Sequence, residues 1–228
     1  MQADPSTQFG ERALFRDRIE AGAALADKLG AYHGRDTLVV GLPRGGVTVA
    51  AEVARSLEAE LDVAVARKLG APGQEELAIG AVTADGTRFL NEDVIALLGV
   101  SEPYLEAVTK VQAAQARRRE EWIRSLRPAA PVGGRTVILV DDGLATGATM
   151  RAAVRSLRNQ RPARLIAAVP VGSREACAAL KPEVDEVVCL HQPEVFGAIG
   201  FYYRHFEPVE DSEVRRLIEA ARATPVGT

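Results

Sequence analysis

The chain has 228 residues, which suits one domain and would be cramped for two. Hydrophobic residues make up 47% of it and charged residues 26%, as in ordinary globular proteins, and a formal net charge of -3 gives no electrostatic reason to expect a nucleic-acid partner. The N-terminus is polar and no apolar run approaches about 18 residues, so we expect neither a signal peptide nor a membrane partner.

The histidines and cysteines are scattered along the chain. His33, His191 and His205 lack the spacing of metal ligands, so a metal bound wholly by protein side chains is not expected. Cys177 and Cys189 are also far from any metal-ligand spacing. Both cysteines are expected to be small core residues, and their pattern indicates the reducing environment of the cytoplasm.

Short apolar runs alternate with segments of helical periodicity, which predicts a single α/β domain over residues 11–222. The expected helices are at 12–29, 47–57, about 101–127, 150–157 and 173–180. The expected strands are at 37–41, 61–66, 77–82, 87–90, 136–140, 164–171 and 186–190. Buried strands that alternate with helices favour a parallel sheet covered on both faces, with a ligand at the carboxyl ends of the strands.

The first strand runs directly into Leu42-Pro-Arg-Gly-Gly46. Glycines let the backbone approach an anion, and Arg44 adds charge and hydrogen-bond donors. This segment is therefore a candidate anion-binding loop at the ligand edge of the sheet. A glycine-rich turn with a surface arginine is the alternative.

A second basic element follows the next strand. Arg67 and Lys68 open a polar segment at 67–76 whose glycines and proline favour a mobile loop. Two cations at this edge could neutralise the charge of a leaving anion. A solvated pair of cations is the alternative.

The long helix at about 101–127 has a clear beginning and end. Ser101 is a plausible N-cap, Pro103 falls in the first turn, and Pro128 follows the last turn. The helix separates the mobile segment from the most informative part of the chain.

That part is Thr136-Val-Ile-Leu-Val-Asp-Asp-Gly-Leu-Ala-Thr-Gly-Ala-Thr149. A buried strand, two acids, a loop of small residues and hydroxyls and a helix N-terminus follow one another, which is the usual place for a phosphate in an α/β protein. Asp141 and Asp142 can accept hydrogen bonds from a vicinal diol and help to hold a divalent cation. The pattern predicts a sugar-phosphate site, and a buried strand with a polar turn is the alternative.

Aromatic residues gather near the C-terminus, in Phe196-Gly-Ala-Ile-Gly-Phe-Tyr-Tyr-Arg-His-Phe206. Phe201, Tyr202 or Tyr203 could offer a stacking face to a ligand. Packing of these rings onto the core is an equally good interpretation.

Together, these segments resemble the type I phosphoribosyltransferases, and in particular a group of stand-alone bacterial phosphoribosyltransferase-domain proteins. The resemblance covers most of residues 12–206 and is motif-specific at 41–46, 67–70 and 138–149. It implies a Rossmann-like parallel sheet flanked by helices, with the helix at 101–127 as an insertion and a small C-terminal hood segment at about 191–210. It also implies a non-proline cis peptide at Pro43–Arg44, which would turn backbone N–H groups toward a diphosphate.

The resemblance implies a role for each motif in binding phosphoribosyl pyrophosphate (PRPP) with Mg²⁺. The ribose hydroxyls and Mg²⁺ would lie at Asp141 and Asp142, which with Arg67 and Lys68 form the catalytic set. The pyrophosphate would lie at Arg44, Gly45, Gly46, Arg67 and Lys68. The 5-phosphate would lie at Leu144, Ala145, Thr146, Gly147, Ala148 and Thr149. Phe201, Tyr202 and Tyr203 are the candidates in the acceptor hood.

One position narrows the choice of acceptor, which the resemblance leaves open. Members that act on 6-oxopurines carry an aspartate as general base just before the Thr-Gly of this loop, whereas here that position is Ala145. A methyl group cannot take a proton, so a 6-oxopurine acceptor is disfavoured. Another nitrogenous acceptor is expected.

The resemblance therefore predicts a cytoplasmic, Mg²⁺-dependent glycosyltransferase of nucleotide metabolism or salvage, with a homodimer as the candidate assembly. It would transfer 5-phosphoribosyl from PRPP to a nitrogenous acceptor and release pyrophosphate. Two alternatives use the same site. One is a PRPP-binding regulator or sensor without turnover, and the other is a hydrolase or phosphorylase-like enzyme acting on a nucleotide or on PRPP.

Overall fold

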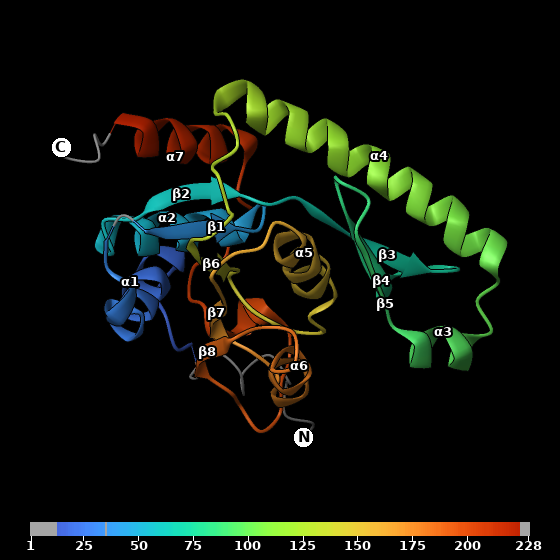
Figure 1. The fold of residues 1–228 in the computed structure, drawn as a ribbon. Coiled ribbons are helices and arrows are strands. Elements are labelled where there is room, and N and C mark those ends of the chain that lie inside the picture. Colours follow the sequence, from blue (N-terminus) through green and yellow to red (C-terminus); the bar gives the residue numbers. More distant parts are fainter. Residues whose placement is uncertain (1–12, 35, 224–228) are drawn as a thin grey trace, which may run out of the picture.

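The computed structural model describes residues 13–34 and 36–223, and its centre is a five-stranded parallel sheet of order β2-β1-β6-β7-β8 (Figure 1). The strands are β1 (Thr37–Gly41), β2 (Glu60–Val63), β6 (Thr136–Val140), β7 (Arg164–Val171) and β8 (Glu186–His191). Every residue of β1 is buried, as are the last four of β6, because helices cover both faces of the sheet. The predicted parallel α/β architecture is confirmed.

Helices cover the sheet in two layers. On one face lie α1 (Arg18–Lys28) and α2 (Gly45–Ser56), and on the other lie α5 (Ala148–Asn159) and α6 (Arg174–Leu180). Alternate residues of β1 serve the two layers, since Val39 packs with α1 and α2 while Leu38 and Val40 pack with α5 and α6. We call this sheet with its helices the body.

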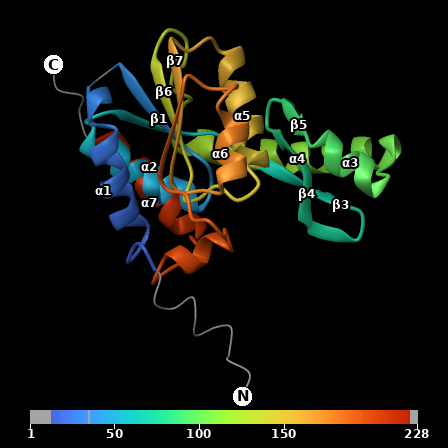
Figure 2. The same cartoon turned by 90° about the horizontal axis from the view of Figure 1, so that it is seen from below.

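An antiparallel unit extends from the body as an arm, residues 66–126 (Figures 1 and 2). It contains β3 (Ala66–Ala71), β4 (Gln74–Thr83) and β5 (Arg88–Leu90), followed by α3 (Glu92–Leu98) and α4 (Glu102–Leu126). One face of this small sheet packs under α4 through Leu69, Ile79 and Leu105. Its other face packs on α5, where Ala78 and Ala81 contact Ala148 and Ala152. The hairpin is therefore held between α4 and α5.

The hairpin corrects the prediction of a mobile polar loop at 67–76. Leu69 and Ala71 are almost fully buried, and this burial makes the first half of the segment a strand. The predicted strand at 61–66 is also shorter than expected, because β2 ends at Val63 and the chain leaves the main sheet before β3 begins. The long helix was predicted correctly, with Ser101 at its N-cap position and Pro103 in its first turn.

Smaller elements complete the fold. They are η3 (Gly30–Tyr32), η4 (Ile199–Tyr202) and α7 (Asp211–Ala223), and α7 packs on α2 and α4. The sequence did not predict α3 or α7. At the N-terminus, α1 begins later than expected because Asp17 caps it, with its carboxylate accepting hydrogen bonds from the amides of Ile19 and Glu20.

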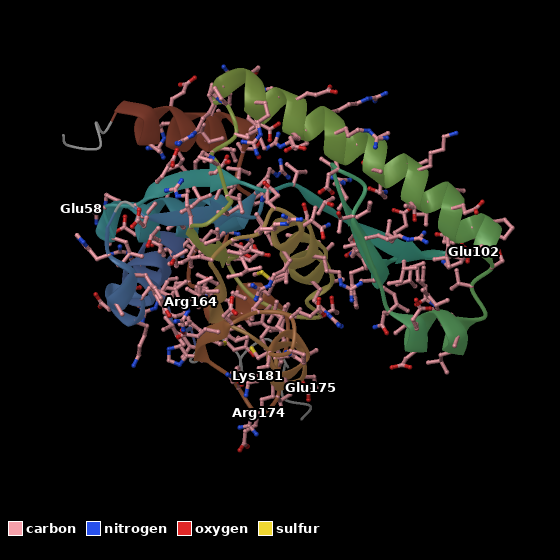
Figure 3. All side chains as sticks on the ribbon, in the orientation of Figure 1. Glu58, Glu102, Arg164, Arg174, Glu175 and Lys181 are labelled. Carbon is pink, nitrogen blue, oxygen red and sulfur yellow. The ribbon has the colours of Figure 1, made fainter. Side chains whose placement is uncertain are left out.

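Figure 3 shows the described side chains on the ribbon. The six charged residues labelled there are exposed: Glu58, Glu102, Arg164, Arg174, Glu175 and Lys181. Within residues 13–34 and 36–223, no helix combines the length and apolar character that crossing a membrane requires.

Candidate active site

The loops that follow β1 and β6 lie side by side. These strands are adjacent and parallel, with Gly41 opposite Val140, and the Leu42 amide donates to the Val140 carbonyl at 2.9 Å. Both segments therefore leave the sheet at the same edge, as expected for a ligand site of a parallel sheet. The structure brings residues 42–46 and 141–149 together, as the sequence predicted.

The first loop meets the acid pair at a distance that only glycine allows. A Cβ atom on Gly45 would lie 1.9 Å from Asp142 Oδ2, and one on Gly46 would lie 2.7 Å from Asp141 Oδ1. The Pro43–Arg44 peptide is cis, which confirms that prediction. The Arg44 side chain is 49% exposed and lies 3.7 Å from the Asp211 carboxylate, so it is free to reorient toward an anion.

The two acids differ in their surroundings. Asp142 is buried, and its Oδ2 accepts a 2.7 Å hydrogen bond from Arg18 Nε. Asp141 is partly accessible, and its Oδ1 accepts from the Asp142 amide at 2.9 Å. Burial and then repulsion from Asp142 raise the pKa of Asp141 well above its ordinary value. Burial also raises the pKa of Asp142, but Arg18 offsets part of that effect. Arg18 thus compensates one acid much more than the other.

The second loop, residues 141–149, is called the donor loop below, after the PRPP donor expected there, and it is anchored on the segment that follows β7. The Leu144 amide donates to Val171 at 2.9 Å, the Ser173 amide donates to Leu144 at 2.8 Å, and Ser173 Oγ donates to the Ala145 carbonyl at 2.8 Å. These bonds fix the backbone that leads into α5.

The far end of this loop is the beginning of α5. Gly147 has φ 75° at the N-cap, a conformation that favours glycine, and Ala148 opens the helix. Ala145 and Thr146 are exposed, while Thr149 is partly buried. The first amides of a helix lack intrahelical partners, so this end of α5 could offer hydrogen-bond donors to an anion.

The hairpin separates the two cations that were expected to act together. Arg67 is exposed and hydrogen-bonds Gln112 and Gln115 of α4. Lys68 is paired with Ala81 across the hairpin, and Ala81 packs on α5 beside the donor loop. Because side chains alternate along a strand, Lys68 lies on the α5 face and Arg67 on the opposite one.

The expectation of two cations facing one anion is therefore wrong for Arg67 in this arrangement. Lys68 is itself engaged, because its Nζ donates to Glu76 Oε2 at 2.7 Å and to the Glu76 carbonyl at 3.0 Å. The Glu76 side chain is 99% exposed, so this ion pair is weak and open to exchange.

The hood residues also divide. Tyr202 and Tyr203 are 9% and 5% exposed, so packing onto the core explains them better than stacking on a ligand. Phe201 is 47% exposed and remains at the surface. The hood segment nevertheless touches the donor loop, because a Cβ atom on Gly143 would lie 2.6 Å from Ile199 Cγ2.

Sequence reasoning missed Arg18 and the hydroxyl of Tyr203. Tyr203 donates to the Asp142 carbonyl at 2.6 Å, and its pKa is raised by burial and then by the nearby Asp142 carboxylate. Neither residue belongs to a local motif: Arg18 precedes Asp142 by 124 positions. Only the packing of α1 and the hood segment on the donor loop reveals them.

The acid pair offers oxygen ligands of the kind that Mg²⁺ prefers. Among the described residues, no three His, Cys, Asp or Glu side chains come together as a metal site would need. Arg18 occupies one oxygen of Asp142, so the partly accessible Asp141 is the better placed of the two to contact an ion. Asp141 and Asp142 fit a Mg²⁺ ion, to which they would offer a carboxylate oxygen.

Comparison with known proteins agrees with this geometry. Residues 16–204 match the model of the phosphoribosyl transferase domain. Two curated proteins of Mycobacterium tuberculosis, from strains CDC 1551 / Oshkosh and ATCC 25618 / H37Rv and each named "putative phosphoribosyl transferase", are 45% identical over 208 residues. This alignment covers 91% of the chain but 47% of each relative, so the chain spans about half the length of those proteins.

The crystal structure of TT1426 from Thermus thermophilus is 46% identical in sequence, with a TM-score of 0.76. That match covers 90% of this chain and 98% of the other. The family match, the relatives and the arrangement of the two loops around the acid pair lead to one conclusion: the chain belongs to the phosphoribosyl transferase domain family.

Proposed function

We propose that the chain is a phosphoribosyltransferase that uses PRPP with Mg²⁺, transfers the 5-phosphoribosyl group to a nitrogenous acceptor and releases pyrophosphate. The convergence of two anion-binding loops on one acid pair supports this proposal best. Gly45 and Gly46 face the oxygens of Asp142 and Asp141 at distances that leave no room for a side chain. A phosphate on one side, a diol in the middle and a diphosphate on the other match these three groups in order.

Each part of the donor has a counterpart in the chain. The amides of residues 145–149 and the hydroxyls of Thr146 and Thr149 would hold the 5-phosphate. The Leu144 amide, which was expected to take part, already donates to the Val171 carbonyl. Asp141 and Asp142 would accept hydrogen bonds from the ribose hydroxyls, and Arg44 with the amides of Gly45 and Gly46 would hold the pyrophosphate. Mg²⁺, when bound, would neutralise the charge on the substrate oxygens.

The chemistry needs positioning and electrostatic stabilisation more than proton transfer from the protein. The acceptor nitrogen forms a bond to the anomeric carbon while the bond from that carbon to the pyrophosphate oxygen breaks, and pyrophosphate leaves with the electron pair. Asp141 would stabilise the positive charge that develops on the sugar, and Lys68 the negative charge on the leaving group. For Lys68 this requires exchange of its ion pair with exposed Glu76.

Ala145 limits the acceptor. Its side chain carries no base, and its carbonyl is already bonded to Ser173 Oγ. A 6-oxopurine would find no carboxylate at this position to take its proton. We therefore propose an acceptor that needs no such base.

Thermal stability tests the donor assignment. PRPP with Mg²⁺ should raise the melting temperature, and Asp141→Asn with Asp142→Asn should abolish that rise, because binding to the folded state alone stabilises it. Glu92→Gln with Asp93→Asn is the matched control, since it also neutralises two adjacent acids, on exposed positions of α3. The absence of a shift in the unaltered protein at millimolar PRPP would refute the proposal.

A screen of nucleobases and amines for pyrophosphate release tests the transfer. Release that depends on one acceptor class identifies a transferase and names its acceptor. Release without an added acceptor would instead show hydrolysis, and binding without release would show a sensor.

A further inference from the structure

Arg18, the first residue of α1, lies where three parts of the site meet. Its Nε donates to Asp142 Oδ2 at 2.7 Å, and its Nη1 donates to the Glu207 carbonyl at 3.0 Å. Its guanidinium carbon lies 3.8 Å from the centre of the Phe206 ring. One side chain therefore joins the donor loop to the end of the hood segment.

The Arg18–Asp142 pair is shielded from water. The two side chains are 11% and 12% exposed, respectively. Removing one partner of such a pair leaves a buried charge without compensation, which is much more costly than breaking a surface pair. The pair can therefore hold Asp142 in one orientation.

Arg18 also touches the loop at 42–46, which we call the pyrophosphate loop after its proposed role. A Cβ atom on Gly45 would lie 2.8 Å from Arg18 Nε as well as 1.9 Å from Asp142 Oδ2. The guanidinium and the carboxylate together fill the space beside Gly45. A shift of Arg18 would change the wall against which this loop rests.

The hood segment and the residues before α1 reach Asp142 as one unit. The amides of Arg204 and His205 donate to the carbonyls of Phe15 and Arg16 at 3.0 and 2.8 Å. The ring of Tyr203 stacks on Phe206 with centres 4.9 Å apart. Asp142 is thus bound to this unit twice, through its carboxylate to Arg18 and through its carbonyl to Tyr203.

We propose that Arg18 is a positioning residue of the donor site, which fixes the Asp142 carboxylate beside the pyrophosphate loop and ties the donor loop to the hood segment. The inference rests on the proposed function, since it concerns the binding of PRPP. Arg18 acts through Asp142 and Phe206 and needs no contact with substrate. Binding of the donor would then be transmitted to the hood segment, where an acceptor is expected.

Calorimetric titration of the full chain with PRPP and Mg²⁺ tests the role. Arg18→Met should weaken binding by about tenfold to hundredfold, the loss typical when a residue that orients a ligand-binding group is removed. Arg18→Lys should recover a large part of this loss, because the charge beside Asp142 remains. Arg16→Met is the matched control, since Arg16 lies two positions away, is 63% exposed and pairs only weakly with Asp17, and it should change affinity by less than about twofold.

A double-mutant cycle separates positioning from general stabilisation of the fold. If Arg18 acts through Asp142, Arg18→Met should cost little further affinity in an Asp142→Asn background. Losses that multiply would mean that the two residues act independently and would overturn the inference.

Hydrogen exchange reports on the link to the hood segment. PRPP with Mg²⁺ should slow exchange over residues 199–207 in the unaltered chain and in Arg16→Met, but not in Arg18→Met. If Arg18→Met does not fold, Phe206→Leu replaces it, because it removes the ring and keeps the charge, and it should reduce the same protection. Unchanged protection in Phe206→Leu would overturn the link.

The outcomes distinguish the two proposals. No PRPP binding by the unaltered chain refutes the proposed function. Normal binding by a folded Arg18→Met variant leaves that function intact and refutes the positioning role.

Discussion

Two regions were expected to contact pyrophosphate, yet they are built in opposite ways. One is the edge of the body that carries the loops at 42–46 and 141–149, called the donor edge here, and the other is the β3–β4 hairpin of the arm. At the donor edge the groups fix one another: Gly45 admits Asp142, and Asp142 is held by Arg18 at 2.7 Å. On the hairpin, Lys68 pairs with a fully exposed glutamate and Arg67 lies on the opposite face. Buried contacts make the first region a preformed site, whereas the second can rearrange at little cost.

This difference shows where local motifs are reliable guides. At the donor edge, glycines and acids have few other arrangements once the strands are paired. In the hairpin, a pair of adjacent cations says nothing about strand alternation, which sends neighbouring side chains to opposite faces. Substitutions in the two regions should therefore differ in size and in kind.

The largest effect is expected from Gly45→Ala. A methyl group cannot fit 1.9 Å from Asp142 Oδ2, so the loop or the acid must move, which should cost about 1–3 kcal/mol of stability and abolish PRPP binding. Thermal melting with and without PRPP measures both effects. Gly30→Ala is the control, since its methyl group would meet nothing within 4 Å. Normal PRPP binding by Gly45→Ala would show that this close contact is unimportant.

Asp141→Asn should lose the stabilisation by PRPP yet melt at a higher temperature without ligand. Burial and repulsion from Asp142 raise the pKa of Asp141, so its contribution to stability is fully present below its unfolded-state pKa and is lost as pH rises through the folded-state value. At any pH above the unfolded-state pKa, Asp141 therefore destabilises the fold relative to a neutral side chain, and asparagine removes that penalty. A gain of about 1 kcal/mol would appear as about 2–4 °C.

The pH dependence checks the sign of this effect. The gain of Asp141→Asn should shrink as the pH falls toward the ordinary aspartate pKa of 3.8 and should vanish below it. Asp185→Asn should behave in the opposite way, because the Leu165 amide lowers the pKa of Asp185 and its carboxylate stabilises the fold at neutral pH. A change in stability of the same sign for Asp141→Asn and Asp185→Asn at neutral pH would contradict this expectation.

Within the hairpin, Lys68→Gln and Arg67→Gln form a matched pair of charge removals. Lys68 lies on the face toward α5, so its loss should weaken PRPP binding by about tenfold, equivalent to about 1.4 kcal/mol. Arg67 faces α4 and should affect binding by less than about twofold, as exposed charges usually do. Titration calorimetry compares the two variants. Equal losses of PRPP affinity would mean that the hairpin rearranges on binding so that both side chains reach the ligand.

The smallest effect is expected from Glu76→Gln, which frees Lys68 from its exposed partner. Binding of PRPP should become tighter by up to about twofold, and less so at high salt, because an exposed ion pair is weak and screened. Affinity measured at low and high salt checks this. A weaker affinity would show that Glu76 holds Lys68 in its working position.

Much of the fold could be predicted, for reasons that are local. The strands at 37–41 and 164–171 were placed at their observed bounds because β-branched and aliphatic runs stop at clear turn or helix signals. The donor loop and the cis peptide followed from a motif whose residue types are set by close backbone approach. Strand β3 and the start of β4 were missed because Arg67, Lys68 and the exposed residues 74–77 have the composition of a polar loop. Helix α7 was missed because its helical pattern follows an irregular segment.

Neighbouring residues determine the strands of the main sheet, the loop expected to offer amides to a phosphate and the missing base at Ala145, since periodicity and turn chemistry act over a few positions. The division of labour at the site does not. Arg18 meets Asp142 across 124 positions. Tyr203 is buried, although the aromatic composition of residues 196–206 suggested a face for a ligand. The adjacent side chains of Arg67 and Lys68 lie on opposite faces of the hairpin. Such pairings depend on how helices and hairpins pack on the sheet, because packing, and not proximity in the chain, sets which charges share a buried space.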